Sequence, residues 1–168
     1  GTVRALKRRG IRPEAIRRYW IESGMKSVDI QFSWDGLYSM NRDIIDGISN
    51  RYFFVDSPVR YDIEGIDVID GKAPLHPDHP ERGDRIYKID GSKTIFISEE
   101  DSKQFSDAGK IRLKDLCNIE YGMPAKYIGN DVSILKHGAK AVQWVSRDSV
   151  KASILMPDGT VREGLAEK

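Results

Sequence analysis

Residues 52–63 read YFFVDSPVRYDI, and at this stretch the hydrophobic periodicity of the chain changes. Before it, apolar residues recur every three or four positions, as they do in amphipathic helices. From this stretch onward they alternate with polar residues over short runs, as they do in half-buried strands. Because 39% of the 168 residues are apolar and 32% are charged, the chain has the composition of a folded globular protein. The sequence therefore predicts an α+β fold, in which a helical N-terminal third precedes an all-β remainder.

Helices are expected over residues 2–10, 13–24 and 33–50, and a shorter one is expected after Ser98. Threonine and serine precede the first and third helices as N-caps, because their hydroxyl groups accept hydrogen bonds from the first free backbone N–H groups. Proline opens the second helix, where its missing N–H group costs nothing. Glycine ends the first two helices.

Short strands are expected over much of the remaining chain. Their ranges are 52–55, 59–63, 85–89, 94–97, 111–113, 117–121, 125–128, 141–145, 152–156 and 160–162. Many short strands separated by turn signals favour a barrel or sandwich over a parallel sheet. Residues 67–84 and 129–138 are rich in turn-forming residues, so we expect them to lead into and out of an inserted lobe over residues 68–135.

The first eighteen residues carry a dense block of positive charge. Its cations are Arg4, Lys7, Arg8, Arg9, Arg12, Arg17 and Arg18. One acidic residue, Glu14, lies among them, so the block has an excess charge of +6 in a chain whose net charge is +1. Such a block forms a solvated helix face or a disordered basic arm, or it binds a polyanion or an acidic partner. Apolar residues recur within it at helical spacing, so we expect these cations to lie on folded helices.

Several functional classes lack their sequence signals. No apolar run approaches the roughly 18 residues of a membrane helix, and no nucleophile elbow or phosphate-binding glycine loop is present. A single cysteine, Cys117, excludes an intramolecular disulfide and fits a reducing compartment. His76 and His79 could start a metal site, but such sites need three or four ligands. We therefore expect no catalytic residue and no metal, and a metallohydrolase centred on these histidines is a weaker alternative.

Residues 110–116 place two cations where they could meet RNA. If Ile111 and Leu113 face a core, Arg112 and Lys114 share the opposite face of the strand, about 7 Å apart. Two cations so placed suit phosphates or the acceptor groups on base edges. Arg51 precedes three aromatic residues, a setting in which unstacked bases can be bound. The alternative is that the aromatic residues are core and the cations are surface, and for residues 53 and 54 the core interpretation is better.

These segments, with three others, resemble a known family. The motifs are TVRALKRRGIRPEAI at 2–16, NRYFFV at 50–55 with Pro58-Val59, HP at 76–77 through PERG at 80–83, IRLKDL at 111–116 and LMPDGT at 155–160. Together, in this order, they resemble the C-terminal anticodon-binding region of archaeal and eukaryotic-type glutamyl-tRNA synthetases, which are class I enzymes. The same motifs occur more loosely in glutaminyl-tRNA synthetases.

The resemblance implies an architecture. Residues 1–50 would be a helical connector that contacts the tRNA backbone, and two antiparallel β-barrels would follow. The proximal barrel would comprise residues 51–67 plus 136–168, incomplete at its C-terminal end, and the distal barrel would be the insertion, 68–135. The chain, which begins inside a helical pattern without methionine, would be a fragment of a monomeric cytoplasmic enzyme. That parent would join glutamate to tRNA using ATP and Mg²⁺, whereas this fragment would hold no cofactor and catalyse no step.

The resemblance also implies roles for particular residues. The position of Arg51 would read the middle anticodon base, and Arg112 and Lys114 would approach the first base. Lys114 stands where glutaminyl enzymes have arginine, so a bidentate contact becomes a point charge. The basic block would meet tRNA phosphates. The expected partner is tRNA-Glu, and tRNA-Gln is a further possibility. A general RNA-binding β-barrel without anticodon specificity is the alternative.

Overall fold

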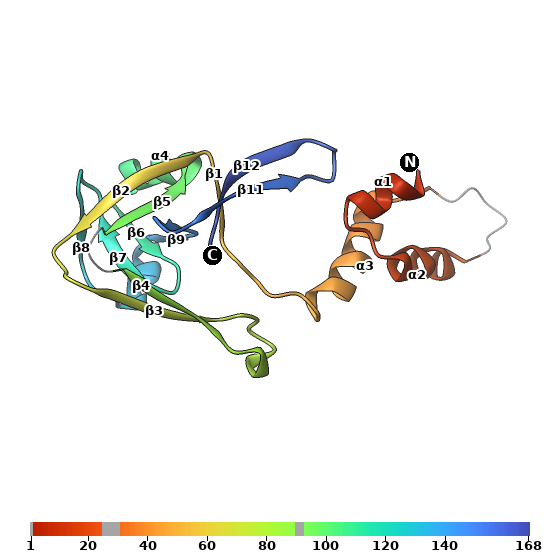
Figure 1. The fold of residues 1–168 in the computed structure, drawn as a ribbon, viewed down its shortest axis with the longest axis horizontal. Helices are drawn as coiled ribbons and strands as arrows, with labels where there is room; N and C mark the ends of the chain where they lie inside the picture. The colour runs from red at the N-terminus through yellow and green to blue at the C-terminus, as the bar shows by residue number, and fades with distance from the viewer. Residues whose placement is uncertain (1, 25–30, 90–92) are drawn as a thin grey trace. The chain divides into compact units, whose positions relative to one another are not determined.

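The computed structural model describes residues 2–24, 31–89 and 93–168 and confirms an α+β fold (Figure 1). The chain forms two compact units. The first comprises Gly1–Asn50 and Leu155–Thr160, and the second comprises Arg51–Ile154 and Val161–Lys168. None of the described helices has the length and apolar character that crossing a membrane requires.

The described residues of the first unit include three helices, α1 (Val3–Arg8), α2 (Pro13–Ser23) and α3 (Trp34–Asp46). The predicted caps are confirmed, because the hydroxyl groups of Thr2 and Ser33 accept hydrogen bonds from the backbone at the helix starts. The predicted end of α3 at residue 50 is wrong. Gly47 caps the helix instead, and Ile48 lies beyond it and is exposed.

Buried contacts between α2 and α3 make up the core of the first unit. Ala15 and Tyr19 of α2 pack with Leu37 of α3 and with Ile11. Asn41 of α3 is also buried, and both ends of its amide are bonded: Oδ1 accepts from the N–H of residue 12 (2.8 Å) and Nδ2 donates to the carbonyl of residue 10 (3.3 Å). This amide therefore fixes the turn between α1 and α2 against α3.

The second unit contains the strands. They are β1 (Phe54–Asp56), β2 (Pro58–Glu64), β3 (Ile69–Pro74), β4 (Asp84–Ile89), β5 (Thr94–Ser98), β6 (Lys110–Leu113), β7 (Cys117–Glu120), β8 (Ala125–Tyr127), β9 (Lys140–Val142), β10 (Val145–Ser146), β11 (Val150–Leu155) and β12 (Val161–Ala166). Between them lie α4 (Glu99–Ala108), which Ser98 caps as expected, and the 3₁₀ turns η1 (Pro80–Arg82) and η2 (Val132–His137). Every strand range that the sequence predicts overlaps an observed strand. β3, which was expected to be loop, is the strand that the prediction missed.

The strands form three sheets. β1, β12 and β11 form one, β3 and β4 form a two-stranded ribbon, and the third has the order β10-β5-β2-β8-β7-β6-β9. Within this third sheet β2 pairs with β8, and β6 with β9, in parallel, so the expectation of purely antiparallel strands is wrong for these pairs. The sheet takes strands from both sides of the boundaries expected at 67/68 and 135/136. β1 and β12 bring the start and the end of the second unit together.

Aliphatic side chains from the large sheet form the core of the second unit, with Phe105 of α4 packed against them. Cys117 belongs to this core, and burial raises the pKa of its thiol to about 12. A thiol with this pKa stays protonated near neutral pH, so Cys117 is not a reactive nucleophile.

Candidate nucleic-acid interface

Arg112 lies on β6 as the sequence predicts. Ile111 and Leu113 are buried at 1% and 0% exposure, so Arg112 projects from the other face of the strand. Its Nη1 donates to Oδ1 of Asn118 (2.9 Å) and to the carbonyl of Asn130 (3.3 Å). Asn118 is itself buried. The guanidinium of Arg112 is therefore held in one orientation by two neighbours before any ligand arrives.

Lys114 differs from the prediction in its local structure. β6 ends at Leu113, so Lys114 lies one residue past the strand, and the chain turns at Asp115, which has a φ of +59°. Lys114 is exposed, and its Nζ lies 5.8 Å from the centroid of the Phe53 ring, within the range of a cation–π contact. This cation is thus coupled to the aromatic residues near the start of the second unit.

Arg51 is exposed and its backbone is anchored. Its N–H donates to the carbonyl of Leu75, at 2.8 Å, just after β3. Of the aromatic residues that follow, Tyr52 is 55% exposed, Phe53 is buried at 4% and Phe54 is half-buried. The core interpretation is confirmed for Phe53, and Tyr52 is the most exposed of the three rings.

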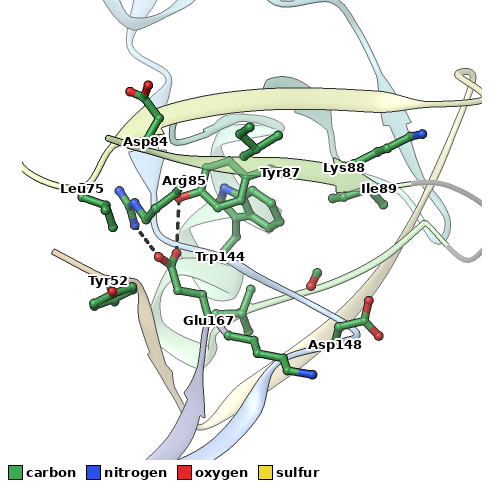
Figure 2. Close-up of a pocket in the computed structure, with 14 residues that line it drawn as sticks. Tyr52, Leu75, Asp84, Arg85, Tyr87, Lys88, Ile89, Trp144, Asp148 and Glu167 are labelled. Atoms are coloured by element: carbon green, nitrogen blue, oxygen red, sulfur yellow. Dashed lines mark hydrogen bonds and ion pairs between the residues drawn. The ribbon is translucent and has the colours of Figure 1, made fainter. Parts of the chain in front are cut away.

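Phe53 packs in a cluster with two other aromatic residues, Tyr87 and Trp144, whose side chains Figure 2 shows. The ring of Tyr87 stacks on it at 6.1 Å with an interplanar angle of 8°, and Trp144 lies 5.1 Å from Tyr87. The indole N–H of Trp144 donates to the carbonyl of Lys114 at 2.9 Å. This cluster therefore connects the backbone of residue 114 to the segment that carries Arg51.

A largely buried ion pair completes the cluster. Nη1 of Arg85 lies 2.6 Å from Oε1 of Glu167, and the two side chains are only 11% and 10% exposed. The Arg85 guanidinium also lies 4.7 Å from the Phe53 ring centroid. The hydroxyl of Tyr87 donates to Glu167 at 3.3 Å (Figure 2). Burial, reinforced by the negative charge of Glu167, raises the pKa of Tyr87 well above its usual value. Tyr87 therefore serves as a neutral donor.

Two hollows open on the surface of the second unit. We call the first the aromatic hollow; it has a volume of about 430 Å³ and is lined by Tyr52, Leu75, Asp84–Ile89, Trp144–Ser146, Asp148, Glu167 and Lys168. We call the second the arginine hollow; it has a volume of about 520 Å³ and is lined by Asp70–Lys72, Ile86, Arg112, Asp115, Leu116 and Asn130. Aromatic faces beside fixed hydrogen-bond donors suit bases that have left their stack.

The basic block lies in the first unit and is mostly exposed. Arg9 is the half-buried member, with its guanidinium carbon 6.0 Å from the centroid of the Trp34 ring. Two other members pair with acids: Arg12 lies 3.9 Å from Glu14, and Arg18 lies 2.6 Å from Glu22 and 3.8 Å from Asp43. Exposed pairs of this kind are weak, so these cations can exchange their partners for phosphates.

The two histidines of the alternative metal site lie in the turn before β4. The ring of His76 is buried and lies 4.8 Å from that of His79, and its Nδ1 accepts a hydrogen bond from the N–H of Asp78 at 3.2 Å. Nδ1 of His79 lies 2.9 Å from Glu81. A backbone hydrogen bond and this histidine lower the pKa of the Glu81 carboxyl. Both imidazoles thus take part in contacts within the turn.

Sequence reasoning missed the Arg85–Glu167 pair, although β4 carries a signal for part of it. Arg85, Tyr87 and Ile89 are alternate residues of β4, so their side chains lie on the same face of the strand. Because Tyr87 and Ile89 turn inward, the pattern places the cation of Arg85 on the core side. A buried cation needs an anionic partner. The partner, more than eighty residues away, gives no local signal.

The family model for the anticodon-binding domain of class I tRNA synthetases (E and Q) matches residues 49–136. The chain is 41% identical over 177 residues to the glutamate–tRNA ligase of Pyrococcus furiosus, 45% over 171 residues to that of Methanocella arvoryzae and 42% over 176 residues to that of Methanocaldococcus jannaschii. These matches cover 99–100% of the chain and 30–31% of each relative. The chain thus spans about 30% of the length of the curated relatives it matches.

Proposed function

The chain belongs to the anticodon-binding domain family of the class I tRNA synthetases (E and Q), and from this premise we propose that it binds tRNA-Glu and recognises its anticodon. The observation that carries the proposal is the family match over residues 49–136, a range that includes Arg51, Arg112 and Lys114. The relatives, which carry the name glutamate–tRNA ligase, favour this function over a general RNA-binding barrel.

Each predicted contact has support in the geometry. Arg51 would read the middle base from a backbone anchored at Leu75. Arg112, held by Asn118 and Asn130, would meet the first base, with Lys114 beside it as an exposed point charge. The basic block, from Arg4 to Arg18, would meet phosphates.

The proposed roles of the domains rest on the two compact units and on the pairing of the strands. Residues 1–50 would act as a helical connector, which agrees with their grouping as a compact unit. The division of the remainder into a proximal barrel (51–67 plus 136–168) and an inserted distal barrel (68–135) stays a prediction. The pairing of β1 with β12 supports a proximal lobe built from both ends of the second unit, whereas the large sheet joins strands of both lobes.

The whole protein would be a glutamate–tRNA ligase that acts as a cytoplasmic monomer. ATP and Mg²⁺ would act in its catalytic part and supply the activation of glutamate. The residues of this chain would hold the anticodon arm of tRNA-Glu, and possible use of tRNA-Gln would depend on the same surface.

Binding of the chain to tRNA-Glu is expected to weaken steeply with salt. The logarithm of the association constant should fall linearly with the logarithm of salt concentration, by about 0.7 to 0.9 for each phosphate that is neutralised. Fluorescence anisotropy of labelled tRNA across a salt series measures this slope. A salt-independent affinity, or no binding at low salt, would contradict the proposal.

The substitution Arg51→Ala is expected to weaken binding of cognate tRNA by about 1–3 kcal/mol and to reduce discrimination at the middle anticodon base. The measurement is the dissociation constant for tRNA-Glu and for variants of its middle base. Arg60→Ala is the matched control, because Arg60 is exposed on β2 and pairs with Asp62. Equal weakening for all RNAs would instead support a general RNA-binding module.

A further inference from the structure

Ile86 is an apolar side chain in a position that the alternation of β4 assigns to solvent. It is 79% exposed, and its neighbours on that face of β4 are Asp84 and Lys88. A single exposed isoleucine is common on protein surfaces and needs no explanation. The position of Ile86 is more specific, because it lines both the aromatic hollow and the arginine hollow. It therefore forms the ridge between two concave sites.

The aromatic hollow places ring faces beside the guanidinium of Arg85. Nε of Arg85 is buried and has no hydrogen-bond partner among the described residues, although Nη1 of the same group is bound to Glu167. The exposed ring of Tyr52 lies in the lining of the same hollow (Figure 2). A flat base that has left its stack matches this exposed ring face.

The arginine hollow has fixed walls. On one side is Arg112, held by two neighbours; on the other is Lys72 of β3, which is paired in register with Ile86. At Gly71 a Cβ atom would lie 2.6 Å from the carbonyl oxygen of Asp115, so β3 passes against the turn after β6 as closely as backbone allows. Lys72 is paired with Asp84 at 2.8 Å, and Asp70 and Asp115 also line the hollow, so the guanidinium of Arg112 is the group that suits the edge of a second base.

We propose that Ile86 is a wedge that inserts between two successive unstacked bases of an RNA loop, with one base in each hollow. The inference deepens the proposed function and rests on it, since it takes the ligand to be an anticodon loop. Apolar side chains inserted between bases replace the lost stacking with their own contact area. Ile86 would lose its exposure to water in the complex.

The test uses a stem–loop RNA that carries the glutamate anticodon and has 2-aminopurine in the loop. This base is bright when unstacked and quenched when stacked. Ile86→Ala is expected to weaken binding about five- to tenfold, because several methyl and methylene groups lose their contacts, and to leave the bound 2-aminopurine dimmer than in the wild-type complex. Ile86→Leu should retain most of both signals. Val132→Ala is the control, because Val132 is exposed at 58% and lines neither hollow.

The possible outcomes separate the wedge from the proposed function. If Arg51→Ala weakens binding but Ile86→Ala changes neither affinity nor fluorescence, the wedge is wrong and anticodon binding stands. If Ile86→Ala lowers affinity without dimming the probe, Ile86 contacts RNA but separates no bases, and the wedge is again wrong. Absence of any RNA binding by the wild-type chain overturns both proposals.

Discussion

Replacing Glu167 with alanine is expected to lower the free energy of unfolding of the second unit by about 3–5 kcal/mol. The substitution leaves the guanidinium of Arg85, which is only 11% exposed, without its anionic partner at 2.6 Å. It also removes the acceptor for the Tyr87 hydroxyl. Urea denaturation followed by tryptophan fluorescence measures the change, because Trp144 belongs to the same cluster.

A double substitution distinguishes the free-energy cost of an unpaired buried charge from the cost of lost packing. Arg85→Met combined with Glu167→Leu removes both charges while keeping much of the side-chain volume, and buried ion pairs replaced in this way often lose little stability. We expect the double variant to be more stable than Glu167→Ala alone. If Glu167→Ala costs less than about 1 kcal/mol, the pair behaves like an exposed one, and its assignment as a buried, structural pair is wrong.

The substitution Phe53→Ala is expected to cost about 3–5 kcal/mol of stability. Phe53 is 4% exposed, and its ring is in contact range of Arg85, Tyr87, Trp144 and Lys114. Removing the ring opens a cavity and deprives two cations of an aromatic face. Because residues 51 and 114 are both linked to this ring, RNA affinity should also fall under conditions in which the variant is folded.

Phe53→Leu is the matched comparison for that prediction. Leucine fills much of the space, and apolar substitutions of similar volume usually cost less than about 1.5 kcal/mol. It keeps the packing but offers no ring face to Arg85 or Lys114. If the leucine variant binds RNA as the wild type does, the cation–π contacts do not position the two cations, and the loss in Phe53→Ala comes from packing alone.

Local signals account for the elements that were predicted correctly. The caps at Thr2, Ser33 and Ser98 act within three residues, and each accepts the expected hydrogen bond. The alternation around Ile111 and Leu113 likewise reports a half-buried strand directly. The end of α3 was predicted too late because the apolar pattern continues past Gly47, although glycine there ends the helix.

Nonlocal contacts explain the structural features that the sequence did not predict. β3 contains glycine and proline and lacks a clear alternation, but it becomes a strand because β4 pairs with it along its whole length. Position 71 needs glycine because the carbonyl oxygen of Asp115 lies where a Cβ atom would be. No sequence pattern near Gly71 reveals this close approach. The parallel pairs of β2 with β8 and β6 with β9 also join segments separated by intervening strands. Pairing of this kind depends on partners that are distant in sequence.

The sequence by itself determined the α+β composition of this protein and the change from helices to strands at residues 52–63. It also determined the family to which the chain belongs. Caps, periodicity and ordered motifs are all local properties of the chain, so they can be read without the fold. Only the tertiary structure decided that Arg85 meets Glu167, that Phe53 lies between Tyr87 and the cations, and that Ile86 separates two hollows. These arrangements depend on burial and on strand pairing across the whole second unit. A charge or an apolar side chain acquires its role there only when the fold brings its distant partners together.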